Sequence, residues 1–225
     1  MLKVRQIYYQ SLQKIVNMER TRDFVPYFNP LSDETLESGV IRRLFESEDY
    51  RHHEYFGVVS HKFYKKLKKD SNYVKRTIEN DEDKADVYSF FPKLDKVNLV
   101  LQGDNWHPLF SDIYRLLADK LDWGIDFSDK SLKMEPIYSN HWIASTDTFE
   151  EFCLDFLIPV MDTINESKVL RDLCNQDANY ISREKLSPEL CEKVFDRPYY
   201  TYHPFILERL FPIFCYLRNK TVKHI

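Results

Sequence analysis

Strand-like segments alternate with helix-like segments along this chain of 225 residues. Four short stretches rich in β-branched and aromatic residues predict strands: Lys3–Tyr9, Glu54–Ser60, Ala85–Leu94 and Glu135–Ser145. Such alternation is typical of α/β proteins whose sheet is largely parallel. We therefore predict a mostly parallel central sheet flanked by helices, built as a single α/β domain over residues 1–225.

Apolar spacing and end signals predict the helices between and after these strands. The segment 22–33 carries two prolines and predicts a loop. The expected helices cover 32–47, 61–70, 107–123, 146–167 with a break at Pro159, 187–195, and 204–217 with a bend at Pro212.

The chain contains only four glycines, which excludes the glycine-rich phosphate loops of the Rossmann and Walker types. Any bound nucleotide must therefore be held by side chains and a few backbone groups. In open α/β sheets, ligands lie beyond the carboxyl ends of the strands. This rule draws attention to Ser60–His61, Ser89–Pro92 and Ser139–Trp142.

Charge and targeting signals limit the partners that we expect. A net charge of -4 and a pI near 6.0 do not favour nucleic acid as a partner. The basic stretch 61–69 is either a solvated helix face or a patch for a polyanionic acceptor or for peripheral contact with an anionic membrane. We expect no transmembrane segment, no signal peptide and no zinc site, and a cytoplasmic location.

Three polar segments interrupt otherwise apolar surroundings. In GDNWHP, Asp104 or Asn105 caps a helix, or Asp104–His107 forms a hydroxyl-binding loop with the Trp106 indole as a stacking platform. In YSNHWIAS, Asn140 lies on the polar face of a strand or at a strand end facing a ligand. Both pairs of alternatives remain open on the sequence alone.

The third segment, TYHPFILERLF, places Glu208 and Arg209 in a helix that is apolar on nearly all sides. The pair either faces solvent or is buried and needs partners, because buried charge is costly. His203 precedes Pro204 and so has an extended backbone that lets its side chain turn towards a cleft.

GDNWHP, SNHW and PFILERLF, together with ADVYSFFP, resemble in their order a group of bacterial glycosyltransferase-like proteins from polysaccharide gene clusters. The resemblance covers roughly Glu54 to Leu217 in short pieces. It implies a GT-A-like fold and a hexosyltransferase that moves a sugar from a nucleotide sugar to a glycan or lipid-linked acceptor. The matching positions are Asp86–Pro92, Asp104–His107, Asn140–Trp142 and Glu208–Arg209.

This resemblance suggests a role for each candidate residue. We expect Asp104 to be the base for the acceptor hydroxyl, and Glu208 to orient Arg209 or bind a sugar hydroxyl. His203 and Arg209 are expected to bind the donor diphosphate. Together with Glu208, they should converge with Asn140 and Asp104 on one cleft at the carboxyl ends of the strands. The remaining candidates for substrate binding are Asn105, Trp106, His107, Asn140 and Trp142.

The chain departs from the family in its metal motif. Glycosyltransferases of this type carry a D-x-D that binds Mn²⁺ or Mg²⁺, but the only such spacing, Asp81–Asp83, precedes a strand and is interpreted as a charged loop. We assign no metal ligand, so a cofactor of Mn²⁺ or Mg²⁺ stays open. The alternative function is a non-catalytic glycan- or protein-binding domain derived from such an enzyme.

Overall fold

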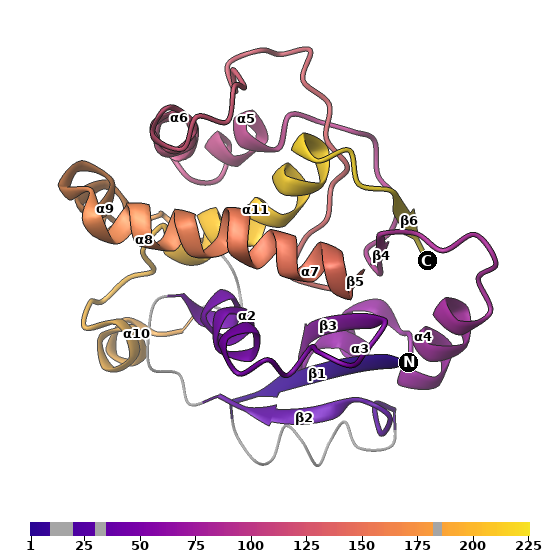
Figure 1. Cartoon of the computed structure of the whole chain (residues 1–225). Coiled ribbons are helices and arrows are strands. Elements are labelled where there is room, and N and C mark those ends of the chain that lie inside the picture. Colours follow the sequence, from indigo (N-terminus) through magenta and orange to yellow (C-terminus); the bar gives the residue numbers. More distant parts are fainter. Residues whose placement is uncertain (10–19, 30–34, 182–185) are drawn as a thin grey trace.

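The computed structural model describes residues 1–9, 20–29, 35–181 and 186–225. Six strands in this part of the chain form one sheet in the order β2-β1-β3-β5-β4-β6 (Figure 1). The strands are β1 (Leu2–Tyr8), β2 (Val25–Phe28), β3 (Tyr55–Ser60), β4 (Val87–Ser89), β5 (Trp142–Ser145) and β6 (Val222–His224).

Five of these six strands run in the same direction. β1 pairs in parallel with β2 and β3, β4 pairs in parallel with β6, and β5 is antiparallel to both β3 and β4. All six residues of β3 are buried, as expected for a central strand of a sheet covered on both faces. The prediction of a mostly parallel α/β sheet flanked by helices is confirmed.

Alternate residues of the strands enter two separate cores. Phe56, Val58 and Trp142 belong to the larger core, whereas Tyr55, Val59 and Ile143 belong to the smaller one. Side chains of successive strand residues point to opposite faces, so β1, β3, β4 and β5 contribute to both cores. Helices α7, α8 and α11 lie together on one side of the sheet (Figure 1).

The larger core is closed by α2, α5, α6, α7, η1, α8, α9 and α11, and the smaller core by α3 and α4. The helices are α2 (Leu36–Glu46), α3 (Phe63–Leu67), α4 (Ser71–Glu79), α5 (Leu99–Asp104), α6 (Phe110–Lys120), α7 (Thr146–Phe152), the π-helix η1 (Cys153–Leu157), α8 (Ile158–Glu166), α9 (Lys168–Cys174), α10 (Pro188–Phe195) and α11 (His203–Leu217).

The prediction of a loop over 22–33 is wrong for its central part, which forms β2. Pro26 is tolerated there because β2 is the edge strand of the described sheet and pairs with β1 alone among the described strands, so a missing N–H need not interrupt a ladder on its other side. Residues 30–33, including the start of the expected 32–47 helix, lie outside the described residues.

Two predicted strands are shorter than expected. Of Ala85–Leu94 only Val87–Ser89 is a strand, and of Glu135–Ser145 only Trp142–Ser145. Ser139 and Asn140 have φ values of 62° and 50°, which no extended strand can contain. The turn that they form ends the loop and starts β5 beside the carboxyl end of β3.

The expected break at Pro159 takes the form of a π-helical turn. η1 ends one residue before α8, and Pro159 occupies the first turn of α8. Proline lacks the N–H that donates the regular helical hydrogen bond. The turn before it therefore widens to a π-helix, and the helix continues into α8. Pro212 lies inside α11 and does not end it.

None of the described helices combines the length and the apolar character needed to cross a bilayer.

Asp49 ties the loop after α2 to β1 through two cations. Its carboxylate accepts hydrogen bonds from Arg5 Nε and Nη2, both at 2.6 Å, and from Lys3 Nζ at 2.9 Å. The Arg5 bond, followed by that of Lys3, lowers the pKa of Asp49 to about 2 despite partial burial.

We expect Asp49→Asn to lower the free energy of unfolding by about 2 kcal/mol at pH 7. A lowered pKa stabilises the fold above the unfolded value of 3.8, and this contribution is lost as the pH falls towards 2. Urea denaturation at pH 7 and below pH 3 checks both parts. As a control, Asp172→Asn removes the exposed ion pair with Lys168 and should change stability by about 0.5 kcal/mol or less. Equal losses in the two variants would contradict the prediction.

Candidate functional site

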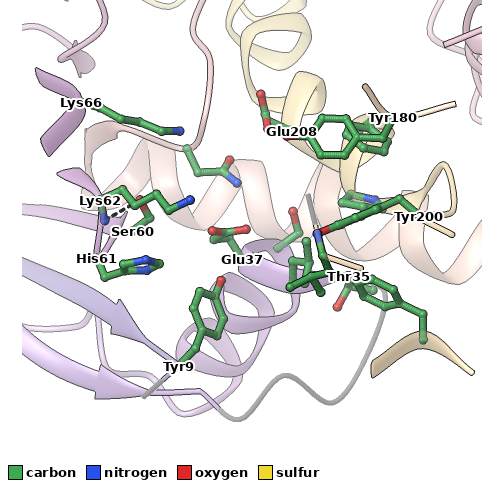
Figure 2. A pocket seen from close by; sticks show the side chains of 17 residues that line it. Tyr9, Thr35, Glu37, Ser60, His61, Lys62, Lys66, Tyr180, Tyr200 and Glu208 are labelled. Atoms are coloured by element: carbon green, nitrogen blue, oxygen red, sulfur yellow. Dashed lines mark hydrogen bonds between the residues drawn. The ribbon is translucent and has the colours of Figure 1, made fainter. Parts of the chain in front are cut away.

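A pocket of about 560 Å³ opens beyond the carboxyl ends of β1 and β3 (Figure 2). β1 lies between β2 and β3, so the chain visits one side of β1 and then crosses to the other. Such a reversal of strand order opens a crevice at the strand ends, where α/β sheets commonly bind ligands. We call this crevice the strand-end pocket. Its polar and charged lining residues are Tyr9, Thr35, Glu37, Ser38, Ser60, His61, Lys62, Lys66, Asn140, Tyr180, Tyr200 and Glu208.

The basic side of the strand-end pocket follows directly from the end of β3. Ser60 is the last residue of the strand, and its hydroxyl accepts the Lys62 backbone N–H at 3.3 Å. Lys66, one turn into α3, donates to Ser139 Oγ at 3.3 Å. Figure 2 shows Lys62 and Lys66 pointing into the pocket from the same side. The ammonium groups of both lysines therefore point into one crevice.

Two carboxylates face these lysines from other elements. Glu37 comes from the first turn of α2 and Glu208 from the second turn of α11. Glu208 Oε1 accepts the Ser139 backbone N–H at 3.1 Å, which fixes its direction. Glu37 lies in the middle of the pocket between the lysines and Tyr200 (Figure 2).

Burial raises the pKa of Glu37 above its usual value of 4.5, and the negative charge of Glu208 adds to this effect. Hydrogen bonds from its own backbone and from Tyr9, and the charge of Lys66, act in the opposite direction. A carboxylate whose pKa is moved towards neutrality can accept a proton more readily than an exposed one.

Aromatic rings form the wall opposite the lysines. The Tyr180 ring lies 5.0 Å from the rings of both Tyr200 and Phe205. His107 stacks on the other part of this wall, with its ring centroid 4.0 Å from that of Phe205. The pocket thus combines cations, carboxylates and a flat apolar surface.

Strained backbone borders the pocket. Ser139 and Asn140 are consecutive residues in the left-handed region, and Leu36 has a φ of 46°. Leu36 and Asn140 line the pocket, and Ser139 bonds both Lys66 and Glu208. Residues other than glycine persist in this region only where the surroundings enforce it, which is common at functional sites.

Of the candidate residues named from the sequence, Asn140 and Glu208 line the strand-end pocket. Asp104, Asn105 and Trp106 line a second pocket of about 450 Å³. Asp104 ends α5 and does not follow a strand, and its Oδ1 accepts the Ser111 N–H of α6 at 2.8 Å. One carboxylate oxygen of Asp104 therefore caps the first turn of α6, as in the helix-cap alternative. The role of Asp104 as a base stays a prediction.

The other candidates are buried and line neither pocket. His107 Nδ1 lies 2.7 Å from the Ala178 carbonyl, and His203 Nδ1 lies 3.1 Å from Thr201 Oγ1. The prediction of an extended backbone at His203 is wrong, because His203 is the first residue of α11 and its side chain is buried. Trp142 stacks on Phe211 with a centroid distance of 3.6 Å. The expected meeting of Glu208, Arg209 and His203 with Asn140 and Asp104 in one cleft is thus found only for Glu208 and Asn140.

The two neighbours in the ERLF segment have different surroundings. The Arg209 guanidinium lies over the rings of Phe110 at 4.9 Å and Tyr138 at 5.9 Å, and its Nε is buried without a hydrogen-bond partner among the described residues. Glu208, one residue earlier, faces the strand-end pocket. The buried alternative therefore holds for Arg209, with aromatic rings in place of the expected anion.

The sequence reasoning did not assign Glu37, Lys62 or Lys66 to a ligand site, and it named the two lysines only within the basic stretch 61–69. The strand-end rule already pointed to Ser60–His61, and reading one residue further would have included Lys62. Glu37 resembles any acidic residue in a first helical turn, so no local signal marks it as a pocket residue.

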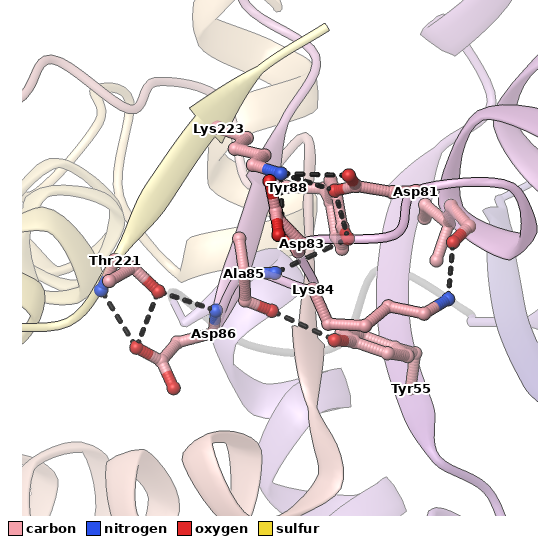
Figure 3. Close-up of polar contacts among 10 residues, drawn as sticks. Tyr55, Asp81, Asp83, Lys84, Ala85, Asp86, Tyr88, Thr221 and Lys223 are labelled. Carbon is pink, nitrogen blue, oxygen red and sulfur yellow. Dashed lines mark hydrogen bonds and ion pairs between the residues drawn. The ribbon is translucent and has the colours of Figure 1, made fainter.

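Asp81 of the D-x-D-spaced segment lies away from the strand-end pocket, in a loop before β4 (Figure 3). Its carboxylate accepts bonds from Tyr88 Oη at 2.7 Å and from Lys223 Nζ of β6 at 2.7 Å and 2.8 Å. Asp86 likewise accepts the Thr221 N–H at 2.8 Å. These acidic residues join β4 to β6. Within the described ranges, no group of three or more His, Cys, Asp and Glu residues is arranged to hold a metal ion.

Comparisons with family models, with curated proteins and with solved structures found no match for this chain. The functional argument therefore depends on the geometry of the pockets.

Proposed function

We propose that the protein is a glycosyltransferase with a GT-A-like sheet, and that the strand-end pocket binds the nucleotide-sugar donor. The observation that carries this proposal is that two lysines, Lys62 and Lys66, and two carboxylates, Glu37 and Glu208, line one crevice at the carboxyl ends of β1 and β3. Parallel sheets commonly bind nucleotides at this position.

The lysines supply the charge that a donor diphosphate requires. Ammonium groups attract phosphate oxygens as point charges and stabilise the negative charge of a leaving diphosphate. In this proposal they take the place of a metal held by D-x-D, since the only segment with that spacing, Asp81–Asp83, lies before β4 and does not line the pocket. Tyr180 and Tyr200 offer a flat face for the base or the sugar.

The reaction transfers the sugar from diphosphate to an acceptor hydroxyl. The acceptor oxygen forms a bond to the anomeric carbon, while the bond from that carbon to the diphosphate oxygen breaks and its electron pair leaves with the diphosphate. In this proposal Glu37 takes the hydroxyl proton in place of Asp104, because Glu37 lies in the strand-end pocket and has a raised pKa, whereas Asp104 lines the second pocket. Glu208, fixed by Ser139, accepts a hydrogen bond from a sugar hydroxyl.

A second candidate function is glycan or protein binding without catalysis. The lack of a D-x-D at the end of a strand and the low number of glycines favour it. Turnover distinguishes the two functions, because a binding domain would hold nucleotide or glycan without breaking the donor bond. Membrane contact through 61–69 stays a prediction, with Lys65 and Lys68 of that stretch exposed.

We expect UDP, GDP or one of their sugar conjugates to stabilise the protein in a thermal-shift screen, with the same effect in Mn²⁺ and in a chelator. Ligand at about 100 times its Kd stabilises a fold by about 2.7 kcal/mol. The double variant Lys62→Ala/Lys66→Ala should bind about 10- to 100-fold more weakly by calorimetry, because two charge-assisted contacts are lost.

Lys65→Ala/Lys68→Ala serves as the matched control, since it removes the same charge from the same stretch outside the pocket. If both double variants bind nucleotide equally weakly, the loss of affinity comes from the change in net charge and not from contacts in the pocket. A lack of stabilisation by every nucleotide, with and without metal, would overturn the proposed donor site.

A further inference from the structure

The second pocket shares a wall with the strand-end pocket. Tyr180, Leu186 and Tyr200 line both. The other lining residues of the second pocket come from the end of α5 and the turn after it, from 177–181, from α10 and from 198–199. A ligand in the second pocket would therefore lie beside the proposed donor, separated from it by two tyrosines and a leucine.

The chemistry of the two pockets differs sharply. Asp104, Asn105, Asp177 and Asn179 supply side-chain oxygens to the second pocket, and none of the described residues that line it is a lysine, arginine or histidine. The carboxylates of Asp104 and Asp177 disfavour phosphate and other anions beside them. Carboxylate and amide oxygens accept hydrogen bonds from hydroxyl groups.

Each carboxylate in the second pocket is fixed through one oxygen. Asp104 Oδ1 accepts the Ser111 N–H at 2.8 Å, and Asp177 Oδ1 accepts the Asn179 N–H at 2.9 Å. Neither Oδ2 has a hydrogen-bond partner among the described residues. Both carboxylates are therefore held in place by the backbone with an acceptor oxygen still available to a ligand.

Trp106 contributes an exposed indole to the same pocket, with 63% of its surface accessible. The other two tryptophans contribute to the large core: Trp142 is 1% exposed, and Trp123 is partly buried and stacks on Phe156. Large aromatic side chains left accessible at a concave site, with a few polar groups around them, are typical of ligand-binding surfaces. An indole offers a flat face for the C–H groups of a sugar ring.

We propose that the second pocket binds a neutral, hydroxyl-rich saccharide, which is the end of the glycan acceptor. The sugar ring stacks on Trp106, and its hydroxyls donate to Asp104 and Asp177. The role as acceptor rests on the proposed transfer function, whereas saccharide binding by itself does not. Because Tyr180, Leu186 and Tyr200 line both pockets, an acceptor held here lies next to the proposed donor.

The test is a titration of the full chain with a panel of neutral trisaccharides: maltotriose, cellotriose, mannotriose and tri-N-acetylchitotriose. At least one should shift the Trp106 fluorescence to shorter wavelength and give a heat signal in calorimetry. Trp106→Ala should weaken that saccharide about tenfold or more, equivalent to 1.4 kcal/mol or more, with UDP and GDP affinity unchanged. Asp177→Ala should weaken it also, which provides a second variant if Trp106→Ala folds poorly.

Lys62→Ala/Lys66→Ala, with its change confined to the strand-end pocket, should leave saccharide affinity as in the parent. Binding by none of the four saccharides at up to about 10 mM would overturn the inference, since millimolar Kd values would be detected. It is equally overturned if saccharide affinity survives Trp106→Ala and Asp177→Ala but is lost in Glu37→Gln, because the sugar then lies in the strand-end pocket. Saccharide binding with no nucleotide binding would refute the donor site and keep the second pocket as a glycan site.

Discussion

Replacing Glu37 by Gln is expected to lower the rate of sugar transfer by about 10²- to 10⁴-fold, the usual contribution of a general base. Nucleotide affinity should change little, since the lysines and not Glu37 carry the diphosphate in the proposed site. Transfer or donor hydrolysis measured at saturating nucleotide sugar, beside calorimetric titration with the nucleotide, separates the two effects.

The pH dependence gives this prediction a second readout. The rate should fall as the pH is lowered through the pKa of Glu37, which lies above 4.5, and Glu37→Gln should lack this dependence. A raised pKa also means that the fold disfavours the ionised form, so wild-type stability should fall as the pH rises above 4.5. Glu37→Gln should remove that fall, which urea denaturation can follow without any donor.

Glu208→Gln is the matched comparison, because Glu208 lies in the same pocket and its carboxylate bonds Ser139. We expect it to raise KM more than it lowers kcat. If Glu37→Gln retains full turnover while Glu208→Gln loses it, the assignment of the base to Glu37 is wrong and Glu208 takes that role.

Trp142→Ala is expected to lower the free energy of unfolding by about 3–5 kcal/mol, the range for large aromatic side chains removed from a core. Trp142 is 1% exposed, stacks on Phe211 with an interplanar angle of 4°, and packs edge-on against Phe152 with centroids 5.8 Å apart. Its removal leaves a cavity between β5, α7 and α11. Urea denaturation followed by circular dichroism measures the loss.

Trp106→Ala is the control of equal chemistry at an exposed position, and it should change stability by about 0.5 kcal/mol or less. Trp142 was expected from the sequence to bind substrate. That role would be restored if Trp142→Ala kept the parent stability and bound nucleotide or saccharide more weakly.

Local sequence patterns were sufficient to predict the class of fold and several strand ends. Alternating apolar residues and β-branched segments located β1 and β3 to within a residue or two. The two-residue period of a strand can be recognised from residues that are close in the sequence. The strand-end rule also led to Ser60–His61 and Ser139–Trp142, both of which contribute to the strand-end pocket.

Prolines made the chain harder to interpret. Pro26 suggested a loop, but a proline is accepted on an edge strand, and only the sheet order shows that β2 is one. The short strand β6 at the end of the chain depends on pairing with β4, more than 130 residues earlier, and was not predicted.

The composition of the pocket was decided by tertiary structure. Glu37, Lys62 and Glu208 lie far apart in the sequence and meet because α2, the end of β3 and α11 converge at one edge of the sheet. Tertiary structure also decided which of the neighbours Glu208 and Arg209 faces the pocket. The rotation of α11 buries Arg209 between Phe110 and Tyr138 and turns Glu208 to the pocket. The sequence determined the strands and helices through short-range periodicity, whereas packing across the sheet determined which polar groups became neighbours, because that depends on contacts between residues distant in the chain.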